Sequence, residues 1–192
     1  MLNARYWTER YLKAQTQWDI GFASPAIIDF VKENFDFDTK ILIPGAGNAY
    51  EVEVLFNLGF KNVFLLDFSE LPIQNFLNRN PNFPIEQILM EDFFEHNASY
   101  DLIIEQTFFC AIDRSLRGEY ARKMHTLLKS KGTLAGLWFA REFTHDGPPF
   151  GGNWEEYEHY FAPYFKTLTC EICNKSIKPR LGNEYFLRFE KQ

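Results

Sequence analysis

Ile41-Leu42-Ile43-Pro44-Gly45-Ala46-Gly47-Asn48-Ala49-Tyr50-Glu51 is the stretch that decides the fold of this chain. A short apolar run leads into a turn with two glycines, and a helix-like segment follows. A second apolar run, Val63-Phe64-Leu65-Leu66, ends at Asp67. Glycines let a backbone pass close to a ligand, and an acid at the next strand end can accept hydrogen bonds from both hydroxyls of a ribose. The pattern predicts a nucleotide-type cofactor site, with an ordinary turn and a solvated Asp67 as the alternative.

The loop departs from the dinucleotide fingerprint in ways that narrow the choice of cofactor. The third glycine of that fingerprint falls at Tyr50, and the loop holds no Arg or Lys to face a pyrophosphate. Glu51 places negative charge in the first turn of the following helix, where a diphosphate would bind. NAD, FAD and ATP are therefore disfavoured. S-adenosylmethionine fits better, because it carries adenosine without phosphates and a cationic sulfonium.

The overall composition limits the class of protein. The 192 residues fit one domain with a sizeable core, and the net charge of −6 argues against a nucleic-acid partner. The first residues have no apolar signal-like region, and no apolar run is long enough to span a bilayer. Three cysteines do not suggest a disulfide framework. We expect a cytoplasmic protein, without membrane contact, that is a monomer.

Cys170-Glu171-Ile172-Cys173 is the one segment with the spacing of a metal or redox motif. It lies in a run that reads as a β-strand, where an offset of three puts the two thiols on opposite faces. The sequence has no second pair of cysteines and no histidine pair at ligand spacing. We therefore expect no metal site.

The remaining chain alternates strand-like and helix-like segments. Serine and proline at positions 24 and 25 begin one helix, and glycine or proline signals close several others. The predicted helices after that start are 49–58, 70–79, 116–129 and 154–161, and the predicted strands are 41–44, 62–66, 85–90, 101–105, 133–140, 164–173 and 184–190, with a turn at Lys131-Gly132.

This alternation predicts an α/β Rossmann-like fold, namely the class I methyltransferase variation. It has a seven-stranded, mostly parallel sheet with helices on both faces and a C-terminal antiparallel hairpin. In such sheets ligands bind at the carboxyl ends of the strands. The residues at those ends are Gly45, Gly47, Asp67, Asp92, Glu105 and Gln106.

Several motifs in order also resemble a known family. They are Trp18-Asp19-x-Gly21-x-x-x-Pro25, Pro44-Gly45-Ala46-Gly47, Asp101-Leu102-Ile103-Ile104-Glu105, Phe108-Phe109-Cys110-Ala111-Ile112 and Gly147-Pro148-Pro149-Phe150. Together they are similar to the thiopurine S-methyltransferase superfamily, and within it to the halide/thiol methyltransferase branch. Two departures leave the chain between subgroups. Gln106 stands where the halide/thiol branch often has tyrosine, and Asn48-Ala49-Tyr50-Glu51 is closer to the thiopurine branch.

The resemblance implies S-adenosyl-L-methionine as cofactor, S-adenosyl-L-homocysteine as product and a small-molecule acceptor. It implies one domain over residues 1–192, with 1–35 as a helical lid. Gly45 would contact the methionine part, Asp67 the ribose, and Asp92 with Phe93 the adenine edge. The remaining implied residues are Trp18, Trp7 and Tyr11 in the lid, Gly47 in the loop, Glu105 and Gln106 near the sulfonium and its amino group, and Arg117 beside the acceptor pocket as the catalytic candidate.

Methyl transfer from a sulfonium asks little of the protein beyond positioning. Iodide, thiocyanate and hydrosulfide need no general base, whereas a thiol, with a pKa of about 8.5, needs slight acidification that Arg117 could provide. Each assignment has a plain alternative. Arg117 could be a solvated helix cation, Trp7 and Trp18 hydrophobic anchors, and Asp92 a cap of the turn after it.

Two other functions stay open at this stage. An O- or N-methyltransferase of a small metabolite would use His145 with Asp146 as a base pair, although a loop histidine without a role is the preferred interpretation. A non-catalytic Rossmann-like binding module is suggested by the missing third glycine and by Gln106. A soft sulfur, selenium or halide acceptor remains the leading hypothesis.

Overall fold

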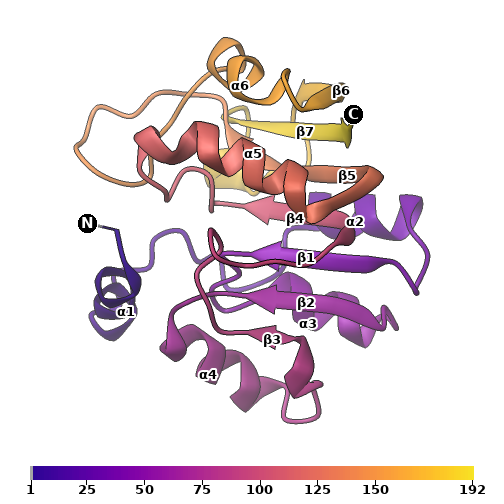
Figure 1. The fold of residues 1–192 in the computed structure, drawn as a ribbon. Coiled ribbons are helices and arrows are strands. Elements are labelled where there is room, and N and C mark those ends of the chain that lie inside the picture. The colour runs from indigo at the N-terminus through magenta and orange to yellow at the C-terminus, as the bar shows by residue number, and fades with distance from the viewer. Residues whose placement is uncertain (1) are drawn as a thin grey trace. The chain divides into compact units, whose positions relative to one another are not determined.

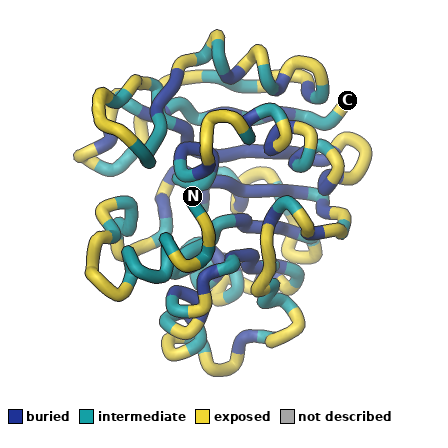
Figure 2. The backbone as a smooth tube through the Cα atoms, turned by 60° about the vertical axis from the view of Figure 1, so that its left-hand side comes forward, coloured by how far each residue is buried: buried dark blue, intermediate teal, exposed yellow. Residues whose placement is uncertain are grey.

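The computed structural model describes residues 2–192, and their contacts form two compact units. One unit ends at His96 and the other begins at Asn97 (Figure 1). Figure 2 shows that the strands form much of the buried part of the chain, whereas the loops at the strand ends are largely exposed. The prediction of a single domain with residues 1–35 as a lid stays a prediction.

The first unit is a parallel three-stranded arrangement covered by helices. Its strands are β1 (Lys40–Pro44), β2 (Asn62–Leu66) and β3 (Ile88–Leu89), in the order β3-β2-β1. Its helices are α1 (Ala4–Leu12), α2 (Pro25–Asn34), α3 (Tyr50–Asn57) and α4 (Glu70–Arg79). Ile41 pairs with Val63, and both are fully buried. Apolar runs without alternation suit strands that are covered on both faces.

The second unit combines parallel and antiparallel pairing. β4 (Tyr100–Gln106) lies parallel to β5 (Leu128–Phe139), and β7 (Glu184–Lys191) pairs antiparallel with both β5 and β6 (Phe165–Ile172). Its helices are α5 (Arg117–Leu127) and α6 (Trp154–Phe161), and the 3-10 turns of the chain are η1 (Ile85–Gln87), η2 (Arg114–Leu116) and η3 (Lys178–Arg180). The predicted seven-stranded, mostly parallel sheet with a C-terminal antiparallel hairpin is confirmed.

An aromatic core explains part of the high phenylalanine content. The rings of Phe109 and Trp138 stack with centroids 4.9 Å apart, and those of Phe161 and Phe189 stack at 5.2 Å. Trp138 also lies 4.8 Å from Phe161, so rings from β5, α6, β7 and the loop after β4 form one cluster. Offset and edge contacts of this kind add to the burial of apolar area. These phenylalanines are therefore core residues of the second unit.

Two predicted boundaries differ from the structure. The strand predicted over 85–90 is only Ile88–Leu89, because Ile85–Gln87 forms a 3-10 turn after Pro84. The strand predicted over 133–140 begins earlier, at Leu128, so the predicted turn at Lys131-Gly132 lies inside β5 as an irregularity. Lys131 has a φ of +61°, and regular pairing with β4 begins at Thr133. A bulge-like irregularity accommodates the extra residues of β5 there, so the strand continues beyond it.

Candidate active site

The glycine turn after β1 has the backbone geometry that its sequence predicts. Gly45 and Gly47 have φ values of +60° and +54°, in the left-handed region that favours glycine. A Cβ added at Gly47 would lie 2.6 Å from the hydroxyl oxygen of Tyr11. The turn therefore leaves a side-chain-free surface that a ligand or the tyrosine hydroxyl can approach closely.

Asp67 at the end of β2 holds this turn in place. Its Oδ2 accepts the Gly47 N–H at 2.9 Å and its Oδ1 accepts the Ser69 N–H at 2.8 Å. The side chain is buried at 8% exposure, so the alternative of a solvated Asp67 is wrong. Burial raises the pKa of Asp67, and the backbone N–H groups oppose that rise. Each carboxylate oxygen can accept a second hydrogen bond, which leaves capacity for two ribose hydroxyls.

Trp7, Tyr11 and Trp18 form one half-buried cluster. The Trp18 ring lies 5.3 Å from Trp7 and 5.7 Å from Tyr11, both edge to face. Trp18 Nε1–H donates to the Tyr11 hydroxyl at 3.4 Å. Burial, with Asp67 and Asp19 nearby, raises the pKa of Tyr11, so this hydroxyl stays protonated at neutral pH. The geometry brings the three predicted lid residues together, with Tyr11 at the glycine turn.

Asp19 and Asn48 belong to one polar network at the glycine turn, although neither was among the predicted site residues. Asn48 Nδ2 donates to Asp19 Oδ2 in a short contact, and its Oδ1 accepts from Asn75 Nδ2 at 3.1 Å. The Arg79 guanidinium donates to the backbone oxygen of Asn48. This network connects the segment after α1, the glycine turn and α4. The position of Asp19 in the Trp-Asp-x-Gly motif is the sequence feature that could have pointed to this network.

Asp92 and Phe93 behave differently from each other. Asp92 is exposed, and its Oδ1 accepts the Phe94 N–H at 2.9 Å, so it caps the turn as the plain alternative proposed. Phe93 is buried, with its ring 5.2 Å from that of Phe94. Asp92 Oδ2 is left for other partners.

Glu105 at the end of β4 is buried with no exposed surface. Its Oε1 accepts the N–H groups of Phe108 at 2.7 Å and Phe109 at 2.9 Å, while its Oε2 has no hydrogen-bond partner among residues 2–192. Burial raises the pKa of Glu105 to about 8, with a further contribution from Glu184 and opposition from the two N–H groups. Its neighbour Gln106 is half-buried.

Gly136 on β5 explains why Glu105 can sit so deep. The two residues are paired across the strands, and a Cβ at Gly136 would collide with the backbone oxygen of Glu105. The glycine allows β4 and β5 to approach at this level. The carboxyl group therefore projects into the aromatic cluster rather than into solvent.

Arg117 at the start of α5 is fully buried, so the alternative of a solvated cation is wrong. Its Nη1 pairs with Glu156 Oε1 at 2.6 Å, and its Nη2 donates to the carbonyl oxygens of Gly151 at 2.9 Å and Phe150 at 3.3 Å. The guanidinium carbon lies 4.7 Å from the centroid of the Phe109 ring. Arg117 thus fixes the loop that contains the Gly-Pro-Pro-Phe motif, and its role in chemistry stays a prediction.

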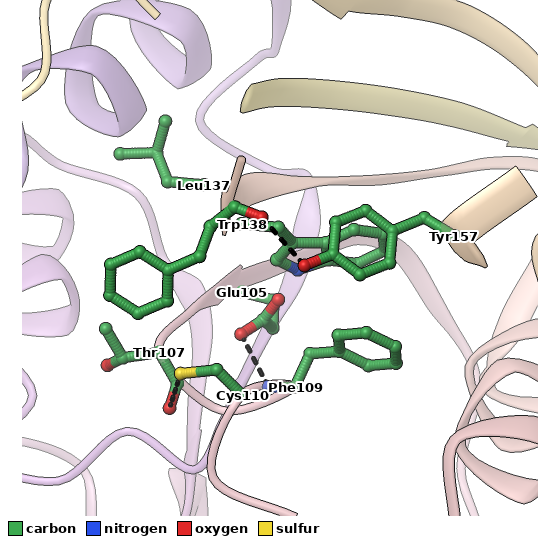
Figure 3. A pocket seen from close by; sticks show the side chains of 8 residues that line it. Glu105, Thr107, Phe109, Cys110, Leu137, Trp138 and Tyr157 are labelled. Carbon is green, nitrogen blue, oxygen red and sulfur yellow. Dashed lines mark hydrogen bonds between the residues drawn. The ribbon is translucent and has the colours of Figure 1, made fainter. Parts of the chain in front are cut away.

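A narrow crevice opens in the second unit beside Glu105 (Figure 3). Its walls leave no room for the centre of a water molecule. The side chains around it are mainly apolar, aromatic or sulfur-containing. They are Glu105, Thr107, Phe109, Cys110, Leu137, Trp138, Phe139 and Tyr157.

His145 and the Cys-x-x-Cys segment lie apart from this geometry. His145 is exposed and its ring stacks on Phe143 at 5.4 Å. Cys170 lies on β6, whereas Cys173 follows its end and donates its backbone N–H to Glu184 O. Within the described chain, no group of three or more His, Cys, Asp or Glu side chains is arranged to hold a metal ion. A search of the same residues found no helix with the length and apolar character to cross a bilayer.

The sequence profile of the thiopurine S-methyltransferase family matches residues 2–184. The chain belongs to this family. It is 30% identical to "Probable thiol methyltransferase 2" of Arabidopsis thaliana and 29% identical to "Thiocyanate methyltransferase 1" of Brassica oleracea, each over 96% of this chain and 84% of the relative. The chain is therefore an S-adenosylmethionine-dependent methyltransferase, which excludes the non-catalytic alternative.

A solved structure confirms the fold over the whole length of the chain. It is the 1,6-didemethyltoxoflavin-N1-methyltransferase of Burkholderia thailandensis, with 1,6-didemethyltoxoflavin and S-adenosylhomocysteine bound. The TM-score is 0.75 at 15% identity, with 100% of this chain and 88% of that chain covered. The residues of the first unit fit the same cofactor, because Gly47 offers a surface that a Cβ would fill and Asp67 retains acceptor capacity.

Proposed function

We propose that this methyltransferase transfers the methyl group of S-adenosylmethionine to a small soft nucleophile: a thiol, hydrosulfide, thiocyanate, a halide or a thiopurine. The observation that carries the proposal is the match to thiol and thiocyanate methyltransferases over nearly the whole chain, at 30% and 29% identity. The crevice beside Glu105 supports it. Aromatic rings and the sulfur of Cys110 line it, and such walls suit a polarisable, weakly hydrated acceptor.

When bound, the cofactor supplies a methyl group on a cationic sulfur, which is a good leaving group. The protein must therefore align the nucleophile with that methyl group and exclude water. Alignment of this kind can contribute roughly 7–11 kcal/mol to lowering the barrier. Buried aromatic walls and a loop fixed by Arg117 supply rigidity and dryness for this purpose.

The first unit supplies the residues that we assign to adenosine. Asp67 would accept both ribose hydroxyls with the lone pairs that Gly47 and Ser69 leave unused. Gly45 and Gly47 would let the backbone approach the ligand, and Phe93 with Asp92 would contact the adenine. Tyr11, with Trp7 and Trp18, would cover the cofactor from the N-terminal segment.

The second unit supplies the residues that we assign to the reacting end. Glu105 and Gln106 would lie near the sulfonium and the amino group of the cofactor. Arg117 keeps a role beside the acceptor pocket, but through the loop that it holds. Its guanidinium is already bound to Glu156 and to the carbonyl oxygens of Phe150 and Gly151, so it does not present a free cation to a thiol.

Release of S-adenosylhomocysteine from S-adenosylmethionine tests the proposal directly. The panel of acceptors is iodide, thiocyanate, hydrosulfide, an aryl thiol and a thiopurine, with a catechol and an aryl amine as oxygen and nitrogen controls. We expect release that depends on the soft acceptors. Release with the oxygen or nitrogen acceptors alone would contradict the proposal and would favour the alternative that His145 serves as a base.

We further propose that the protein acts as a monomer in the cytoplasm and does not bind nucleic acid. The net charge of −6 supports the last point, because a phosphate backbone requires a basic surface. Light scattering at working concentration would test the oligomeric state, and a DNA-binding titration at low salt would test the absence of nucleic-acid binding. A stable dimer or micromolar DNA binding would contradict them.

A further inference from the structure

One buried oxygen of Glu105 is not used by the fold. Oε1 accepts two backbone N–H groups and so holds the Phe108-Phe109 turn, whereas Oε2 has no partner in the described part of the chain. Figure 3 shows the carboxyl group between Trp138 and Tyr157 on one side and Cys110 on the other. A buried acceptor without a partner carries a cost in stability, so its retention suggests a task outside folding.

The other polar groups around Glu105 are largely engaged. The Tyr157 hydroxyl donates to the Phe139 carbonyl oxygen at 2.7 Å, and the Cys110 thiol donates to the Thr107 carbonyl oxygen at 3.3 Å. Oε2 is therefore an acceptor without a partner among the described residues in the crevice walls, which must move apart to admit a molecule because they leave no room for the centre of a water molecule. Trp138 Nε1–H, also without a hydrogen-bond partner in residues 2–192, is a donor in the same walls.

We propose that Glu105 accepts the proton of a thiol or hydrogen sulfide acceptor, with Oε2 as the receiving atom. This inference rests on the proposed function and adds a residue-specific division among its acceptors. Those that carry a proton need Glu105 as a base, whereas thiocyanate and iodide need only the position that the crevice provides.

The chemical step balances with the groups already named. The S–H bond of the thiol breaks, its proton goes to Glu105 Oε2, and the electron pair stays on the thiol sulfur. That pair forms the new S–CH3 bond while the methyl carbon separates from the sulfonium, whose bonding pair becomes a lone pair of the neutral thioether product. The proton then leaves Glu105 for solvent, so one proton is released per turnover.

The electrostatic surroundings suit a base for this purpose. Burial and Glu184 from β7 raise the pKa of Glu105 to about 8, close to the value of about 8.5 for a thiol. Proton transfer between groups of matched pKa is nearly balanced. A nearby cationic ligand would lower the pKa of Glu105 and favour the carboxylate. The other ionisable groups that couple to Glu105 are Cys110, Tyr120 from α5 and Tyr157 from α6.

Glu105→Gln is the decisive variant, because glutamine keeps an oxygen for the Phe108 and Phe109 N–H groups but cannot take a proton. We expect the ratio of kcat/KM for an alkyl thiol to kcat/KM for thiocyanate or iodide to fall by about 100-fold or more, as for the loss of a general base. Any loss of cofactor binding affects both kinds of acceptor alike and cancels in this ratio. Thr107→Val is the matched control. It also removes a polar group from the crevice lining, but one that is no proton acceptor at neutral pH, and should affect both acceptors alike.

An equal loss with both kinds of acceptor would mean that Glu105 only caps the turn, and would overturn the proposal. An absence of turnover by the unaltered enzyme with every soft acceptor would instead overturn the proposed function, and this assignment with it. Thermal melting of each variant separates a folding defect from either result.

A second readout does not depend on activity or on the variant. The side-chain carboxyl carbon of Glu105, followed by NMR in the unaltered protein and assigned through its side-chain connectivity to the backbone, should titrate near 8. Titration near the ordinary value of glutamate would leave a base too weak for a thiol, and would overturn the proposal even if the glutamine variant failed to fold.

Discussion

Asp67 in the first unit and Glu105 in the second occupy equivalent places, each at the carboxyl end of a parallel strand and each bound to the N–H groups of the following loop. The two carboxyl groups differ in whether the backbone N–H groups leave one of their oxygens without a hydrogen bond. Asp67 has a backbone N–H on each oxygen, with a further one from Phe68, and keeps a little exposure. Glu105 places both of its N–H partners on Oε1, and its buried Oε2 has no partner among residues 2–192. The same topology thus yields a carboxylate suited to hydroxyl groups and a carboxyl suited to a proton.

The largest effect should come from Arg117, the buried cation of the second unit that holds the loop at Phe150 and Gly151. Arg117→Met removes the closer of the two cations at Glu156 and the closer donor to Gly151 O, which should lower the free energy of unfolding by about 3–5 kcal/mol. Arg114→Met is the matched control, because Arg114 is more exposed and should contribute less than about 1 kcal/mol. Urea denaturation measures both. Equal losses would show that Arg117 is not the anchor of this loop.

The pH dependence of stability should separate the two acids next. Because the pKa of Glu105 is raised to about 8 on folding, the folded chain holds a proton that the unfolded chain releases above about 4.5. The contribution of Glu105 is therefore fully present below that value and is lost as pH rises to about 8. The loss should be of the order of 2–4 kcal/mol for so buried a group.

Urea denaturation of the unaltered protein and of Glu105→Gln at several pH values gives that contribution as a difference. The stability of the glutamine variant should decline less between about pH 4.5 and 8. Parallel curves for the two proteins would contradict a raised pKa at Glu105.

Cofactor affinity should respond mainly to Asp67. Asp67→Ala leaves the Gly47 and Ser69 N–H groups unpaired and removes the acceptor for the ribose, so the Kd for S-adenosylhomocysteine should rise about 30- to 100-fold. Asp92→Ala, which removes an exposed acid, should raise it only a few fold. Calorimetric titration compares the two. An unchanged Kd for Asp67→Ala would contradict the assignment of this half of the site.

The smallest effect concerns the glycine turn that Asp67 holds. Gly47→Ala combines a left-handed φ with a Cβ 2.6 Å from the Tyr11 hydroxyl, and should cost about 1–3 kcal/mol of stability. Gly21→Ala has a similar φ but no atom within 4 Å of the new Cβ, so it should cost only the backbone strain, about 1 kcal/mol. Adding Tyr11→Phe should recover part of the difference. No recovery would mean that the contact is not the cause.

The sequence predicted those features that local pattern determines. The turn, the strand that ends at Asp67 and the helix after it depend on neighbours in the chain, and they were predicted at their observed places. Arg117 was not, because its partner Glu156 is 39 residues away and an arginine on a helix usually faces water. The raised pKa of Glu105 was not predicted for a related reason. It depends on the burial of its side chain, and that burial follows from the close approach of β4 to β5 at Gly136. The contact of Asp19 with Asn48 joins residues 29 apart.

The low burial of helix α1 bears on how fast the product leaves this enzyme. None of its nine residues is fully buried, whereas α3 buries Val52 and Leu55. A helix with so little buried apolar area opens by local unfolding at a small fraction of the global free energy. The amide hydrogens of Ala4–Leu12 should therefore exchange with deuterium well before those of Tyr50–Asn57. If Tyr11 closes over the cofactor, bound S-adenosylhomocysteine should slow the exchange of these amide hydrogens. The rate of product release would then equal the rate at which helix α1 opens.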